Sequence, residues 1–134
     1  LSLSNKETKD IIKICSLNNI NLEINYFRRF EQSAVEIKKI LSNISFFRAT
    51  VFYSNGVINN SSHFIDLVNY WFGKPKNVFL KKNNGIVKKT YDDYDLDFEL
   101  RYDNGDVNFF SWKIFYLKYQ FYSIFLFNKL SFNS

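Results

Sequence analysis

The most regular hydrophobic pattern in the chain lies at residues 94–102, where apolar and charged side chains alternate. The apolar positions are Tyr94, Leu96, Phe98, Leu100 and Tyr102. Such alternation predicts a strand with one buried and one solvated face. The sequence Asp103-Asn104-Gly105 that follows predicts a tight hairpin turn and a return strand. We expect the acids of this region to lie on a solvated face, not around a metal ion; they are Asp92, Asp93, Asp95 and Asp97.

Helical patterns occupy three other segments. A capping box at Ser4 and Glu7 opens the first helix, which should end at Asn18-Asn19. The second is expected over residues 31–43, and its buried side should consist of Ala34, Ile37, Ile40 and Leu41. The third is expected over residues 62–72, with Ser61 or Ser62 as its cap and with Gly73 and Pro75 at its end.

Shorter apolar runs predict further strands over residues 22–26, 46–53 and 77–82, and a turn at Asn83-Asn84-Gly85. A helix followed closely by the strand at 22–26 is half of an α/β unit. Such a strand needs a parallel neighbour from upstream, and the chain contains no candidate for it. The chain also begins with Leu1 and has no methionine, so we expect that the natural gene product begins elsewhere.

Composition restricts the classes of protein that remain. The 134 residues are enough for one domain, and 46% hydrophobic content excludes general disorder. The single Cys15 excludes an internal disulfide, and with one histidine in the chain we expect no metal site. The tail at 113–134 is aromatic, contains no acid or glycine, and differs from everything before it.

The net charge of +5 raises the question of nucleic-acid or membrane binding. The lysine pairs are scattered at 38–39, 81–82 and 88–89, which is typical of solvated faces, so we expect neither partner. An aromatic binder of single-stranded nucleic acid stays open as a weaker hypothesis. The polar start is no secretory signal, and the apolar run at 114–127 is too short to span a bilayer, so we expect a cytoplasmic protein.

The candidate chemistry is concentrated around His63, the only histidine. On a helix over 62–72, His63 and Asp66 share one face, and Asn59 precedes the helix. This group is either a small catalytic or binding constellation, or a half-buried histidine that is hydrogen-bonded to Asp66. Arg28 and Arg29 follow the strand at 22–26, where open α/β sheets bind ligands. They either contact an anion or substrate, or they close a surface loop.

Several of these motifs, in this order, resemble the Gfo/Idh/MocA oxidoreductases. The matching stretches lie within residues 1–111 and comprise residues 25–30 (NYFRRF), 56–66 (GVINNSSHFID), 70–73 (YWFG) and 96–105 (LDFELRYDNG). The resemblance implies a truncated α+β (α/β) fold in three parts. Residues 1–30 would be the last helix and strand of a Rossmann nucleotide-binding domain. Residues 31–112 would be part of the substrate and oligomerisation domain, a mostly antiparallel sheet with helices packed on one face, and residues 113–134 would be a discordant tail.

The resemblance also implies roles for the candidate residues. His63 takes the place of the family's acid/base histidine, and Asn59 takes the place that is usually an aspartate. Arg29 and Arg28 match polar residues beside the cofactor and substrate cleft, and Asp66 would orient the helix or His63. We expect the substrate-binding set to be Asn59, Arg29, Arg28 and Asp66. The complete protein would then transfer hydride from a sugar or nucleotide-sugar hydroxyl to NAD or NADP.

The glycine-rich phosphate loop and the catalytic lysine of that family are absent from the chain. We therefore expect this fragment alone to be inactive and to bind no cofactor. The alternative is a non-enzymatic remnant or a stand-alone binding and oligomerisation module. In either case we expect a homo-oligomer formed through the open sheet face, because the apolar side of the 94–102 strand would need a partner.

Overall fold

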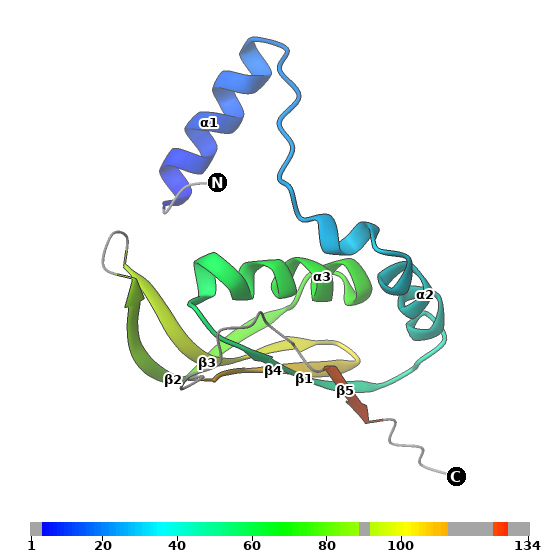
Figure 1. Ribbon diagram of the computed structural model, residues 1–134. Coiled ribbons are helices and arrows are strands. Elements are labelled where there is room, and N and C mark those ends of the chain that lie inside the picture. The colour runs from blue at the N-terminus through cyan, green and yellow to red at the C-terminus, as the bar shows by residue number, and fades with distance from the viewer. Residues whose placement is uncertain (1–3, 89–91, 113–124, 129–134) are drawn as a thin grey trace.

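The computed structural model describes residues 4–88, 92–112 and 125–128, which form a mixed sheet with helices above one face (Figure 1). The helices are α1 (Asn5–Leu17), α2 (Gln32–Leu41) and α3 (Ser62–Phe72). A 3-10 segment (Phe27–Phe30) precedes α2, and a π segment (Val57–Ser61) leads into α3. The strands are β1 (Phe47–Tyr53), β2 (Asn77–Lys88), β3 (Asp93–Tyr102), β4 (Gly105–Ser111) and β5 (Phe125–Asn128).

The sheet has the strand order β2-β3-β4-β1-β5. Neighbours are antiparallel except for β1 and β4, which run parallel. The predicted hairpin is confirmed, because Tyr102 pairs with Gly105 across the turn. The predicted fold class, a mostly antiparallel sheet with helices on one face, is confirmed as well.

The main core lies between the sheet and α3. Phe98 of β3 stacks on Phe109 of β4 with ring centroids 4.5 Å apart, and Phe64 and Val68 of α3 belong to the same buried cluster. The apolar side of the 94–102 strand is therefore covered from within the chain. The expectation that this side needs an intermolecular partner is wrong for Phe98, Leu100 and Tyr102, which are buried within the chain. The homo-oligomer itself stays a prediction.

A second, smaller cluster joins α2 to α3 through Ala34, Leu41, Leu67 and Trp71. The indole N–H of Trp71 donates to the Ala34 carbonyl oxygen at 3.0 Å. The prediction that Ile40 belongs to the buried side is wrong, since its side chain is 65% exposed. Ile40 lies further round the helix than Ile37, beyond the edge of the stripe that faces α3.

Two local predictions are wrong because hydrogen bonding between strands, and not the local pattern, decides whether a strand forms. The segment at 22–26 is extended but forms no strand, because none of the described residues pairs with it. The turn predicted at Asn83-Asn84-Gly85 is instead absorbed within β2, whose register shifts between Asn83 and Ile86. Gly85 has φ +107°, and its N–H donates to the Asn83 side chain, so the extra chain forms an irregularity in the strand.

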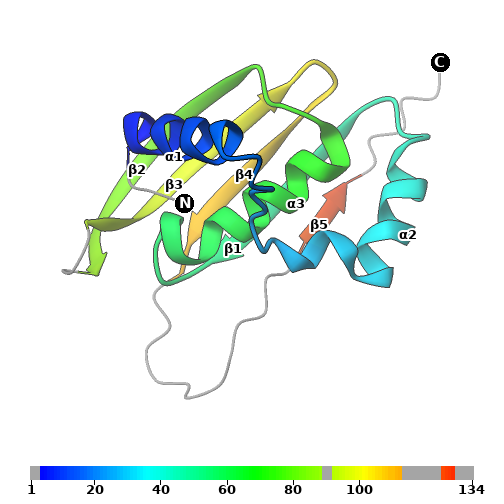
Figure 2. The same ribbon diagram turned by 90° about the horizontal axis from the view of Figure 1, so that it is seen from above.

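The first helix stands apart from this body. One of the two hydrogen bonds of its predicted capping box is confirmed, because the Glu7 N–H donates to Ser4 Oγ at 3.1 Å. None of its residues is buried, and Ile14 and Leu17 are 58% and 73% exposed. In the view from above, α1 lies over the β2–β3 side of the sheet, whereas α2 lies on the side of β1 and β5 (Figure 2).

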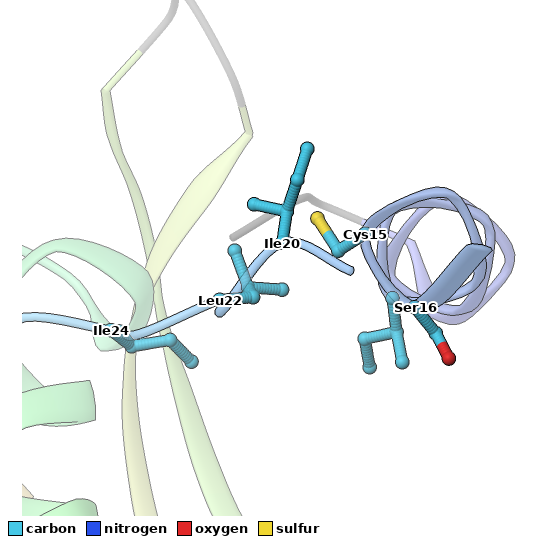
Figure 3. Close-up of a pocket in the computed structure, with 6 residues that line it drawn as sticks. Cys15, Ser16, Ile20, Leu22 and Ile24 are labelled. Carbon is cyan, nitrogen blue, oxygen red and sulfur yellow. The ribbon is translucent and has the colours of Figure 1, made fainter. Parts of the chain in front are cut away.

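An open apolar groove lies between α1 and the extended segment that follows it. Figure 3 shows Cys15 on the helix with its sulfur toward the extended segment, which carries Ile20, Leu22 and Ile24; Ile12 and Ser16 complete the lining. We call this set the α1 groove. Within the described residues, no helix is long and apolar enough to cross a membrane.

Candidate functional site

The candidate site lies where the 3-10 segment packs against α3. Strand β1 delivers the chain to Gly56, whose φ of +86° turns it into the π segment and then into α3. Asn59 lies in the π segment with an exposed side chain, and His63 lies in the first turn of α3. No described contact joins these two side chains.

His63 is held by aromatic rings. The Tyr26 ring meets the imidazole edge-on with centroids 5.3 Å apart, and the Phe27 ring lies at 6.3 Å. The Nδ1 atom is buried and has no hydrogen-bond partner. Nε2 is therefore the ring nitrogen that can reach a ligand.

Asp66 pairs with Arg29 and not with His63. Arg29 Nε donates to Asp66 Oδ2 at 2.9 Å, and Arg29 Nη2 donates to Oδ1. This two-point contact is the favoured geometry of an arginine with a carboxylate. Hydrogen bonding to Asp66 raises the pKa of Arg29 above its ordinary value. The pair ties the 3-10 segment to α3, so the interpretation of His63 as a partner of Asp66 is wrong.

Arg28 differs from its neighbour. Its guanidinium carbon lies 4.7 Å from the Phe64 ring centroid and 5.5 Å from that of Phe27. Its Nε atom is buried and has no hydrogen-bond partner. Arg28 is thus fixed by cation–π contacts, while its charge has no carboxylate partner among the described residues.

Two acids of β3 hold the entry to α3. Asp93 is fully buried, and its two oxygens accept the N–H groups of Ile58 and Asn59 at 2.9 Å each. Asp95 is 5% exposed and accepts the Gly56 N–H at 3.0 Å. The prediction of a solvated face is wrong for both, because unpaired N–H groups at a helix start attract carboxylates.

The serine cap predicted for α3 is also wrong. Ser61 and Ser62 both have helical backbone angles because the π segment extends the helix upstream. The Ser62 hydroxyl donates to the Ile58 carbonyl oxygen at 2.7 Å, and Ser61 Oγ is buried with no partner. Asp93 takes the role of the cap from across the sheet. The sequence carried no signal for Asp93 in this role, because Ser61 and Ser62 offered ordinary capping side chains at the expected helix start.

Within the described residues, no three histidine, cysteine or acidic side chains come close enough to hold a metal ion. The structure thus brings Arg29 to Asp66, Arg28 to Phe64, and Tyr26 and Phe27 to His63. It leaves the Asn59 side chain exposed at the start of the same helix.

No protein-family model and no curated protein matches the chain. Solved structures do match in fold. YvaA from Bacillus subtilis, which is classed as an oxidoreductase, superposes with a TM-score of 0.63 at 18% identity, over 79% of this chain and 35% of that one. The WlbA (WbpB) dehydrogenase from Thermus thermophilus, solved with NAD and α-ketoglutarate, gives 0.62 at 14% identity, over 79% and 38%.

A third structure, a protein from Klebsiella pneumoniae classed as an oxidoreductase, gives a TM-score of 0.61 at 15% identity, over 82% of this chain and 34% of that one. These neighbours are Gfo/Idh/MocA-like oxidoreductases, so the fold implied by the sequence motifs is confirmed. The chain spans about a third of the length of the structures that it matches.

Proposed function

We propose that this chain is the substrate-side part of an NAD(P)-dependent oxidoreductase of the Gfo/Idh/MocA type. In the complete protein, residues 1–30 would close a nucleotide-binding domain, and residues 31–112 would carry the substrate site. The substrate would be a sugar or nucleotide sugar whose hydroxyl is oxidised. The observation that carries the proposal is His63, held by aromatic rings with one ring nitrogen accessible, in a chain with the fold of these oxidoreductases.

The chemistry of His63 follows from its two nitrogens. Oxidation of a hydroxyl to a carbonyl releases a proton from oxygen and a hydride from carbon. An imidazole suits the proton transfer because it changes charge near neutral pH. Nδ1 is enclosed, so the proton would pass to Nε2. Asn59 could hold a substrate hydroxyl by hydrogen bonds from the start of the same helix.

One contact supports a cofactor site outside the described residues. At Gly56 the chain turns from a strand into a helix. The N–H groups of this turn donate to Asp95 and Asp93. Those carboxylates occupy the place where a dinucleotide-binding turn receives its pyrophosphate. The cofactor that accepts the hydride would therefore be held by another part of the complete protein.

The proposal is tested by assaying hydride transfer with the protein that the complete reading frame encodes. With NAD or NADP and a panel of sugars and nucleotide sugars, the nicotinamide absorbance should change. His63→Asn should lower kcat by about 10²- to 10⁴-fold, the usual contribution of a positioned acid/base. Lys74→Gln, an exposed position after α3, is the control and should leave kcat unchanged. Full activity of the His63 variant, or no hydride transfer from any sugar to NAD or NADP, would overturn the proposal.

A second test uses the 134-residue chain alone. NADH and NADPH should show no saturable binding in a fluorescence titration, because carboxylates already accept the N–H groups of the one strand-to-helix glycine turn among the described residues. Tight binding of either nucleotide would contradict the division of roles that we propose.

The alternative function is a stand-alone binding module. The observation that favours it is the exposed apolar surface of α1 and the following segment. Hydride transfer by the complete reading frame separates the two, since a module without a cofactor would show none.

A further inference from the structure

The two adjacent arginines of the 3-10 segment have different surroundings. Arg29 donates twice to Asp66, so its charge is compensated. Arg28 has no ion pair among the described residues, and its buried Nε–H has no acceptor. The Nε atom is enclosed, like Nδ1 of His63, so the terminal Nη groups of Arg28 are the donors that can reach a ligand.

The Arg28 guanidinium is pre-positioned. The Phe64 ring centroid at 4.7 Å and the Phe27 ring centroid at 5.5 Å hold the guanidinium carbon in place. An arginine presents five N–H donors in a rigid planar arrangement. That arrangement matches the oxygens of a carboxylate or a phosphate. Little side-chain freedom remains to be lost when an anion binds.

Arg28 and His63 share a neighbour. Both lie against the Phe27 ring, at 5.5 Å and 6.3 Å from its centroid, so their separation cannot exceed the sum of these distances. One sugar with a charged substituent is of this size. A ligand that places a hydroxyl at His63 can therefore place its substituent at Arg28.

The local charges favour an anion. In the 3-10 segment, the π segment and α3, the only acid is Asp66, which Arg29 compensates. Asp93, which lies against the π segment, is fully buried, and its two oxygens already accept backbone N–H groups. The uncompensated charge beside His63 is that of Arg28.

We propose that Arg28 recognises an anionic group of the substrate, so that the substrate class is an acidic sugar, with a carboxylate or a phosphate on the unit that is oxidised. This inference rests on the proposed function, because it assumes that the sugar hydroxyl lies at His63.

The single histidine makes a direct test possible on the 134-residue chain, because its imidazole gives one set of NMR resonances. The chain is titrated with methyl glucoside, with methyl glucuronide and with glucose 1-phosphate at constant ionic strength. The anionic sugars should move the His63 resonance with an apparent Kd at least about tenfold lower than the neutral sugar, as expected for charge-assisted hydrogen bonds. Comparison of the two anionic sugars distinguishes a carboxylate from a phosphate.

Arg28→Gln should remove the preference for anionic sugars and leave the response to methyl glucoside unchanged. Arg28→Lys keeps the charge but loses the planar set of N–H donors, so this variant should retain part of the preference for anionic sugars. Arg48→Gln is the matched control, because Arg48 is an exposed arginine paired with Asp106 on the sheet. It should behave like the wild type.

Each remaining outcome overturns a specific claim. Equal responses to neutral and anionic sugars, an unchanged preference in Arg28→Gln, or an equal response to sulfate would overturn the role of Arg28 alone. No response of His63 to any sugar would overturn the proposed function together with this inference.

Discussion

At Gly56, an added Cβ would disturb the start of α3. Its φ is +86°, and an added Cβ would lie 2.2 Å from Asp93 Oδ2. Gly56→Ala would strain the backbone by about 1–2 kcal/mol and displace a carboxylate that holds two buried N–H groups, at about 1–3 kcal/mol. We expect it to lower the free energy of unfolding by about 2–5 kcal/mol in urea denaturation, the sum of these two costs.

Gly73→Ala is the matched control. Gly73 has a similar φ of +82°, but an added Cβ would meet nothing within 4 Å. It should show only the backbone strain, about 1–2 kcal/mol. Equal losses for the two variants would show that the contact with Asp93 is unimportant.

Glu99 makes the free energy of unfolding depend on pH in the acidic range. Its hydrogen bonds with Lys81 and then Arg101 lower the pKa of Glu99 below the ordinary value of 4.5. A lowered folded pKa contributes stability above the unfolded value, and that stability is lost as the pH falls through the folded value. Glu99→Gln should therefore flatten the loss of stability below about pH 4.5.

Urea midpoints measured from neutral pH down to the acid limit check this prediction. Asp103→Asn is a suitable control, because its carboxylate is 72% exposed and pairs only with Lys76 at the surface. A Glu99→Gln curve parallel to the wild type throughout would contradict the role of Glu99.

The candidate residues were predictable by position but not by partner. Helical spacing placed His63 and Asp66 on one face, yet Arg29, from a different element, takes the carboxylate of Asp66. The acids of β3 obeyed the alternation of a strand, and that pattern alone could not reveal that Asp93 and Asp95 meet N–H groups of a distant loop. Local spacing determines a face, whereas tertiary contacts determine the partner.

At the scale of elements, the start of α3 depends on a carboxylate from another strand. Asp93 accepts the N–H groups of both Ile58 and Asn59. Asp93→Asn removes the charge, and an amide can accept through one oxygen only. We expect the exchange of these two amide hydrogens to accelerate about tenfold or more, the factor for loss of about 1.4 kcal/mol of local stability.

Hydrogen exchange followed by NMR checks this, with the amides of β4 as an internal reference for global unfolding. Those amides should change only by the global loss of stability. Uniform acceleration throughout the sheet would mean that Asp93 supports the whole fold, and unchanged exchange at Ile58 and Asn59 would contradict its capping role.

The elements that were predicted correctly are those that local chemistry specifies. The hairpin turn at 103–105 joins two strands that pair with each other, and the capping box of α1 satisfies its own helix start. The segment at 22–26 has an equally clear pattern, but a strand requires a hydrogen-bonded neighbour, and the described residues offer none. Pairing also explains why the Asn-Asn-Gly sequence became part of β2 instead of a turn.

The whole molecule consists of a body with its own core and an appended helix. The sheet, α2 and α3 bury two apolar clusters, whereas no residue of α1 is fully buried. The apolar residues of the α1 groove are exposed, with Ile20 at 56% and Leu22 at 41%. Exposed apolar surface of this kind marks a place where other protein packs.

Removal of residues 1–25 tests this division. Because α1 buries no residue, we expect the free energy of unfolding of the shortened chain to lie within about 1 kcal/mol of the full chain. Loss of cooperative unfolding in urea would show that α1 belongs to the folding unit.

Self-association of the full chain should depend on the same surface. The combined substitution Ile12→Lys and Leu22→Lys introduces two charges into the α1 groove, where both side chains are exposed. Sedimentation velocity should show a lower fraction of oligomer than in the wild type, because charged side chains oppose burial of the groove between copies. Val78→Lys, at an exposed apolar position on β2, is the control and should leave the fraction unchanged. If Val78→Lys reduced association and the double variant did not, the interface would lie on the sheet, as the sequence pattern first led us to expect.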